Sequence, residues 1–144
     1  MTSAHGEESA ARYAADANVL LSAACGKAAL RVFRVENPPS ILTPDAVLAE
    51  VGEYLEELAA RAGLPLLVVR THLESFPIEI VPEARYSIKM KTAMALIGSR
   101  DPDDAHLLAL ALALEIPIWS NDNDFRDCGV PVFTTARLLK HLGA

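Results

Sequence analysis

The sequence has few cysteines, few aromatic residues and no long apolar run. Its two cysteines, Cys25 and Cys128, are far apart and show none of the close spacing that holds zinc. We expect free thiols in a reducing, cytoplasmic setting, since a disulfide would require their two loops to meet. With aromatic residues at only 6%, the core must be built mainly from Ala, Leu, Val and Ile. No apolar stretch is long and pure enough to span a bilayer, so no membrane association is expected.

A basic excess is also missing. The formal net charge is −6, which argues against a nucleic-acid coat protein but not against an enzyme whose acidic residues hold a cation. The nucleophile elbow of serine hydrolases, the P-loop and the dinucleotide-binding glycine motif are all absent. Residues 1–11 lack the basic-then-apolar order of a signal peptide. We interpret 1–11 as a flexible tail and 12–144 as a single domain.

Strand-like and helix-like segments alternate along the chain. Apolar runs bounded by turn residues predict strands at 12–16, 40–42, 78–81, 116–120 and 131–134. Helical periodicity and start signals predict helices at 17–24, 27–35, 43–61, 84–97, 101–115 and 135–142. Residues 64–76 fit either a strand or a helix, and we favour a helix. This alternation predicts an α/β fold with an open, mainly parallel sheet and helices on both faces.

Acidic residues stand at the same end of several predicted elements. Asp16 ends the first strand, and Asp122 and Asp124 follow the strand at 116–120. Asp104 lies in the first turn of a helix, and Glu50 borders the apolar stripe of another. In a parallel sheet, strand carboxyl ends and helix amino ends share one edge. Carboxylates gathered there repel one another and favour a hard cation such as Mg²⁺ or Mn²⁺.

Each of these acids also has an ordinary structural interpretation. Asp16 would suit an N-cap, and Glu50 could be a surface residue whose stem packs at a helix boundary. Asp104 would stabilise a helix dipole by roughly 0.3–1 kcal/mol. Three acids within 101–104 exceed what capping needs, so we expect Asp101 to cap the helix, Asp103 to face solvent and Asp104 to face inward.

The stretch 120–125 reads Ser-Asn-Asp-Asn-Asp-Phe. Asn and Asp are common turn residues, so a plain polar turn is one interpretation. An EF-hand loop is the other familiar interpretation, but the glycine at its sixth position and the closing glutamate are missing. Ser120, and likewise Asn18 after the first strand, could hydrogen-bond a carboxylate or a metal-bound water.

Taken together, the chain resembles the PIN-domain ribonucleases, close to the VapC-type toxins of bacterial toxin–antitoxin pairs. The matching stretches are 16–20 (Asp-Ala-Asn-Val-Leu), Thr43-Pro44 with Glu50, 101–111 (Asp-Pro-Asp-Asp-Ala-His-Leu-Leu-Ala-Leu-Ala) and 120–125. The resemblance implies a three-layer α/β/α fold and an endoribonuclease dependent on Mg²⁺ or Mn²⁺. It places the catalytic, metal-binding acids at Asp16, Glu50, Asp104 and Asp122, with Asp124 as a further ligand. Ser120 stands where the family usually has Thr, and it keeps the hydroxyl.

RNA binding would need cations around this acidic site. The candidates are Lys27, Arg31, Arg34, Lys89 and Arg100, although each could equally belong to a solvated helix face.

The resemblance further implies an antitoxin partner and a homodimer. We expect a two-fold interface built on exposed apolar surface around Val32, Phe33 and Val35. Two alternatives are a catalytically inactive PIN-like module that only binds a partner, and a receiver-like signalling module. A receiver domain needs an acceptor Asp after a mid-chain strand and a Lys after a late strand. Here Pro82-Glu83 follow the mid-chain strand, and no Lys follows Ser120 directly.

Overall fold

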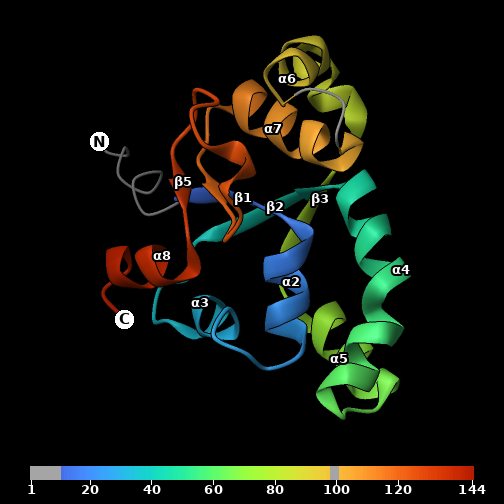
Figure 1. Ribbon diagram of the computed structural model, residues 1–144. Coiled ribbons are helices and arrows are strands. Elements are labelled where there is room, and N and C mark those ends of the chain that lie inside the picture. The colour runs from blue at the N-terminus through green and yellow to red at the C-terminus, as the bar shows by residue number, and fades with distance from the viewer. Residues whose placement is uncertain (1–10, 98–100) are drawn as a thin grey trace.

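A five-stranded parallel sheet forms the centre of the protein (Figure 1). The computed structural model describes residues 11–97 and 101–144, so the expected tail lies almost wholly outside the described residues, as does Arg100. The strands are β1 (Arg12–Ala15), β2 (Ser40–Pro44), β3 (Ile78–Val81), β4 (Ile118–Trp119) and β5 (Val132–Phe133). Their order is β3-β2-β1-β4-β5, and every neighbouring pair is parallel. The predicted open parallel sheet is therefore confirmed.

Helices cover both faces of this sheet (Figure 1). They are α2 (Ala17–Ala24), α3 (Leu30–Arg34), α4 (Asp45–Ala62), α5 (Leu66–Ser75), α6 (Met90–Ile97), α7 (Pro102–Leu114) and α8 (Thr135–His141), with short 3₁₀ turns η1 (Glu83–Arg85), η2 (Ser87–Lys89) and η3 (Asn123–Phe125). Helix α7 lies against one face with α6 outside it, while α2, α3, α5 and α8 lie on the other side. Helix α4 packs against α2 and α5. The fold is thus the expected three-layer α/β/α arrangement.

Most element boundaries match the sequence-based prediction, and the ambiguous segment 64–76 is the helix α5. Two helix starts differ. The helix expected over 27–35 begins only at Leu30, because Gly26, at φ +79°, ends α2 and a turn follows it. The helix expected over 84–97 starts as η1 and η2, which are tied to α7 by a hydrogen bond between the Tyr86 hydroxyl and His106 Nδ1 at 2.7 Å.

Thr43 has a different role from a helix cap. It belongs to β2, opposite Ile80 of β3, and Pro44 is the residue before α4. The buried Thr43 hydroxyl donates a hydrogen bond to the carbonyl of Ala15 at 3.1 Å. A residue that looks like a local helix signal therefore joins two strands beside Asp16.

The core is continuous across both faces of the sheet. Helix α7 is buried on nearly all sides, as its uniformly apolar sequence predicts. On the other side, Phe33 stacks on Phe76 with ring centroids 4.4 Å apart and lies 5.8 Å from Trp119. Val32 is fully buried. The expectation that Val32 and Phe33 form an exposed apolar surface for dimerisation is therefore wrong, because α3 turns these side chains into the core.

Two other expectations concern the cysteines and the membrane. Cys25 and Cys128 are not joined by a disulfide, and the Cys128 thiol donates a hydrogen bond to the Asp124 carbonyl at 4.0 Å. No helix in the described part of the chain has the length and apolar character needed to cross a membrane.

Candidate active site

The first part of the site forms where β1 and β4 lie side by side. The strand order reverses at this point, which is the usual location of a binding crevice in an open parallel sheet. Asp16 follows β1 directly, and Ser120 follows β4. The Ser120 hydroxyl donates a hydrogen bond to Asp16 Oδ2, and Asp16 Oδ1 accepts one from the Val19 backbone N–H at 3.0 Å. Asp16 is therefore a helix N-cap as well as a buried, precisely oriented carboxylate at the crevice.

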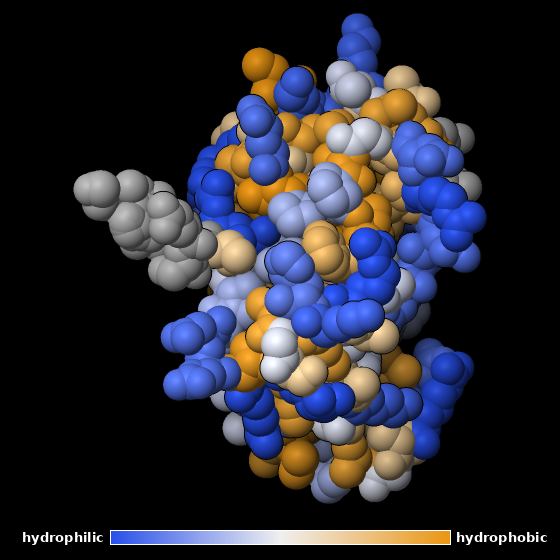
Figure 2. Space-filling model, turned by 90° about the vertical axis from the view of Figure 1, so that its left-hand side faces the viewer, coloured by the Kyte–Doolittle hydropathy of each residue, from blue (hydrophilic) through white to orange (hydrophobic). Residues whose placement is uncertain are grey.

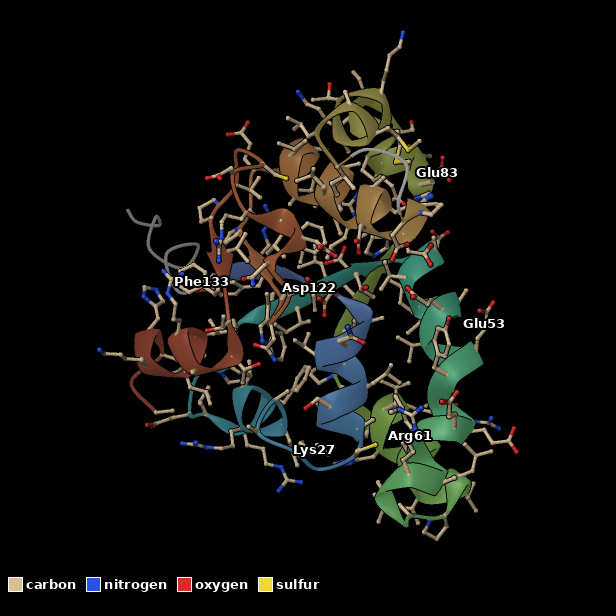
Figure 3. The ribbon with its side chains drawn as sticks, in the orientation of Figure 1. Lys27, Glu53, Arg61, Glu83, Asp122 and Phe133 are labelled. Atoms are coloured by element: carbon tan, nitrogen blue, oxygen red, sulfur yellow. The ribbon has the colours of Figure 1, made fainter. Side chains whose placement is uncertain are left out.

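Three other elements bring acids to the same place. Glu50 comes from the second turn of α4, Asp104 from the third position of α7, and Asp122 from the turn after β4. Together with Asp16, their side chains line a small cavity of about 60 Å³. The remaining lining residues are Ala17, Asn18, Val47, Asp101, Asp103 and Leu107. Figure 3 labels Asp122 among oxygen-tipped side chains between the sheet, α2 and α7. The structure thus brings together residues as far apart in the chain as Asp16 and Asp122.

Sequence reasoning missed the part played by Asp101 and Asp103. Asp101 caps α7 as expected, accepting a hydrogen bond from the Asp103 N–H at 3.0 Å, but it also lines the cavity. The expectation that Asp103 faces solvent is wrong, because its half-buried carboxyl hydrogen-bonds Glu50. The signal was present in the density of acids at 101–104, although a helical wheel alone does not show that α4 lies opposite.

Electrostatic crowding is the main property of this cavity. Burial raises the pKa of Asp16, although hydrogen bonds from Ser120 and Val19 oppose the shift. Burial and then the charges of Asp101, Asp124, Asp122 and Asp16 raise the pKa of Asp104 to about 7. Glu50 also has its pKa raised to about 7, first by burial and then by its hydrogen bond to Asp103 and neighbouring acids. Carboxyl groups held in this way disfavour their own ionised forms unless a positive charge compensates them.

The side chains that line the cavity are of the type that binds a hard divalent cation, because every polar one among them except Asn18 is a carboxylate. The described residues nevertheless contain no group of three or more His, Cys, Asp or Glu side chains already arranged to hold a metal ion. Several carboxylate oxygens instead accept hydrogen bonds from the backbone or from Ser120. Coordination by these acids would therefore require side chains to rotate within the cavity.

The loop after β4 is a hydrogen-bonded polar turn. The Asp122 N–H donates to Ser120 Oγ at 3.0 Å, and Asp122 Oδ1 accepts from the Asp124 N–H at 3.1 Å. Asn121 Oδ1 accepts from the Thr135 N–H at 2.8 Å, which ties the loop to the start of α8. Asp124 does not line the cavity, although its charge contributes to the raised pKa of Asp104. Residues 120–125 therefore form the polar turn, and Asp122 of this turn also lines the cavity.

The remaining predicted residues differ in their position relative to this cavity. Asn18 is exposed and lines it directly. Lys27, Arg31, Arg34 and Lys89 are all exposed, but none of them lines the acidic cavity. Arg100 lies outside the described residues.

Comparison with known protein families gave a match to one family model. Residues 15–143 match a family model described as a PIN domain, which covers nearly the whole chain from the end of β1 to the end of α8. A search of curated proteins found no match.

Proposed function

The chain belongs to the PIN-domain family. We propose that it is a metal-dependent endoribonuclease and that it is the toxin of a type II toxin–antitoxin pair. The observation that carries the proposal is the shared cavity of Asp16, Glu50, Asp104 and Asp122, built from β1, α4, α7 and the loop after β4. Separate capping and turn roles would not require all four to face one small space.

We propose that these four acids hold Mg²⁺ or Mn²⁺, with Asp124 as a further ligand. When bound, such an ion lowers the pKa of a coordinated water and neutralises phosphate charge. Asp16 is the most fixed member, since its two oxygens are oriented by Val19 and Ser120. Ser120 thus acts as a positioning residue, and Asn18 at the cavity wall is placed to hydrogen-bond a water or a phosphate oxygen.

The reaction that fits this cavity is hydrolysis of an RNA phosphodiester bond. Water attacks phosphorus in line and gives up a proton, and the bond between phosphorus and the 3′ oxygen breaks. The 3′ oxygen takes up a proton and leaves as the 3′-hydroxyl of the upstream fragment, while the downstream fragment keeps the phosphate on its 5′ oxygen. The chain supplies orientation and charge in place of a covalent nucleophile. Among the described residues, no serine or cysteine lines the cavity, which agrees with this division of roles.

The test is cleavage of single-stranded RNA by the purified protein with Mg²⁺ or Mn²⁺. Asp16→Asn and Asp104→Asn keep the side-chain size and remove one negative charge, and each should abolish cleavage. Asp127→Asn is the matched control, since Asp127 is exposed and does not line the cavity. Undiminished cutting by either cavity variant, or by the wild type in excess EDTA, would overturn the metal-dependent mechanism.

Two non-enzymatic alternatives make different predictions. An inactive PIN-like binding module would show no metal-dependent cleavage under any condition. A receiver-like module is disfavoured by topology, because receiver sheets have the order 2-1-3-4-5 and this sheet has the order 3-2-1-4-5.

The toxin role and the homodimer belong to the same proposal. Induced expression should arrest growth, and Asp104→Asn should relieve the arrest if RNA cleavage causes it. Co-expression of an antitoxin encoded next to this gene should have the same effect. A monomer mass in light scattering at roughly tens of micromolar would count against the dimer, since weak interfaces are populated in that range.

A further inference from the structure

Two grooves lie on different sides of α2. One runs between α2 and α4: it begins at Asn18 and Glu50, which also line the cavity, and continues past Leu58 to Arg61. The other lies between α3 and α8, with a volume of about 750 Å³. It shares no lining residue with the cavity, but one of its lining residues, Asn121, is the neighbour of Asp122 in the chain. Figure 1 shows α4 on one side of α2, and α3 and α8 on the other.

The two grooves differ in charge. The α2–α4 groove contains Glu50 and Glu57 together with the cations Lys27 and Arg61, and Arg61 is paired with Glu57 along the helix. The α3–α8 groove is lined by Arg31 and Lys140, and no acidic side chain lines it in the part of the chain that the structure describes. Both cations are exposed. Figure 2 faces the α8 side of the molecule, where hydrophilic residues extend across the middle of the surface. A polyanion leaving the site would therefore be attracted more strongly to the α3–α8 groove than to the other.

We propose that the α3–α8 groove holds the backbone of single-stranded RNA beside the bond to be cut, an inference that rests on the proposed nuclease function. Arg31 and Lys140 contact phosphates, one from each wall of the groove. Neither residue touches the reacting atoms, so both are binding residues and the acids remain the catalytic group.

Asn121 connects this groove to the acidic cavity. Its amide oxygen is occupied by the Thr135 N–H, which fixes the side chain and leaves the NH₂ group as the donor end of the amide. Asn121 therefore positions the RNA between the groove and Asp122. Because it lies on the same short loop as Asp122, a strand that follows the groove passes directly to the carboxylates.

The salt dependence of RNA binding tests this proposal. Binding of a fluorescent, unstructured RNA oligonucleotide is measured in EDTA, where no cutting occurs, over a range of salt concentrations. Each phosphate contact contributes about 0.7 to the slope of log K against log salt for a single strand. The double variant Arg31→Gln/Lys140→Gln should lower the slope by about 1.4, which corresponds to roughly 25-fold weaker binding at about 0.1 M salt. In cleavage assays with Mn²⁺, it should raise KM more than it lowers kcat.

Matched variants separate this groove from general charge effects. Arg31→Lys/Lys140→Arg keeps both charges and should retain the slope. Arg70→Gln removes one exposed charge from α5, outside both grooves, and should leave binding unchanged. Arg61→Gln probes the α2–α4 groove and should also have little effect.

The outcomes separate the two proposals. An unchanged slope in Arg31→Gln/Lys140→Gln, or a loss of binding in Arg61→Gln instead, overturns the α3–α8 path while leaving metal-dependent cleavage intact. A wild type that binds RNA with the expected slope but never cuts it overturns the nuclease function and supports the groove. A wild type that binds no single-stranded RNA overturns both.

Discussion

The acidic cavity is next in the chain to an aromatic cluster formed by Phe33, Phe76 and Trp119. The contacts in the cluster stabilise the fold, whereas the charges in the cavity destabilise it. Trp119 is the last residue of β4 and lies fully buried against Phe33, and its indole N–H donates to Thr135 Oγ1 at 3.0 Å. Ser120, one residue later, holds Asp16 in the cavity. In the aromatic cluster every group has a favourable partner. In the cavity the carboxyl groups repel one another, so the fold carries a local cost there, as functional sites commonly do.

The largest expected loss of stability comes from a substitution in the aromatic cluster. Trp119→Ala should lower the free energy of unfolding by about 3–5 kcal/mol, because it leaves a cavity in a close-packed core. Trp119→Phe should cost less, since most of the ring contact remains. Urea denaturation followed by circular dichroism measures both, because Trp119 is the only tryptophan and fluorescence would be lost. A loss below about 1 kcal/mol in Trp119→Ala would show that this cluster does not carry the fold.

A divalent cation should offset much of the repulsion between the carboxylates of the acidic cavity. At a Mn²⁺ concentration about 100-fold above its dissociation constant, binding should stabilise the wild type by about 2.7 kcal/mol. Each kcal/mol shifts the melting temperature by roughly 2–8 °C for a domain of this size. Asp104→Asn should show a smaller shift at the same Mn²⁺ concentration. Equal shifts in the two proteins would mean that Mn²⁺ binds elsewhere.

The metal-free protein should become less stable as the pH rises from about 4 to about 7. The pKa values of Glu50 and Asp104 are about 7 in the folded protein, against roughly 4 in an unfolded chain. The folded state therefore binds more protons than the unfolded state in this window, and the free energy of unfolding falls as those protons are lost. Urea denaturation in EDTA at several pH values measures the trend, which should be shallower in Asp104→Asn. A rise in the free energy of unfolding over the same pH range would contradict the inference that these carboxyl groups repel one another in the folded protein.

The smallest expected effect is a gain from relieving one charge. Asp122→Asn in the metal-free protein should raise the melting temperature, because the Asp122 charge disfavours ionisation of both Asp16 and Asp104. Asparagine keeps the oxygen that accepts the Asp124 N–H, so the turn should survive. Asp127→Asn serves as the control and should lie within about 0.5 kcal/mol of the wild type. A lower melting temperature for Asp122→Asn would favour a purely structural role in the turn.

Local signals predicted most of the fold because they depend on near neighbours in the chain. The Asp101-Pro102 helix start and the turn at 120–125 follow from backbone preferences that act over a few residues. Thr43 shows the limit of this reasoning. Thr-Pro-Asp is a good local helix start, yet the hydroxyl bonds to Ala15, which is 28 residues away, because β1 and β2 are paired.

The site was only partly predictable for the same reason. Asp16, Glu50, Asp104 and Asp122 could be placed at one edge of the sheet, because parallel strands end together. The inward position of Asp103 could not be predicted, since it depends on Glu50 of α4 lying opposite α7. The prediction of an exposed surface around Val32 and Phe33 was wrong because α3, a helix of 5 residues, is too short for its periodicity to show which side is buried.

By itself the sequence determined the alternation of strands and helices, the parallel sheet and the presence of acids at its carboxyl edge. Those features follow from hydrophobic periodicity and capping, which act within one element. The packing of the elements decided which acids share the cavity, how far burial and repulsion raise their pKa values, and which of two grooves carries an excess of positive charge. Those properties depend on distances between elements that are remote in the chain, and packing alone fixes such distances.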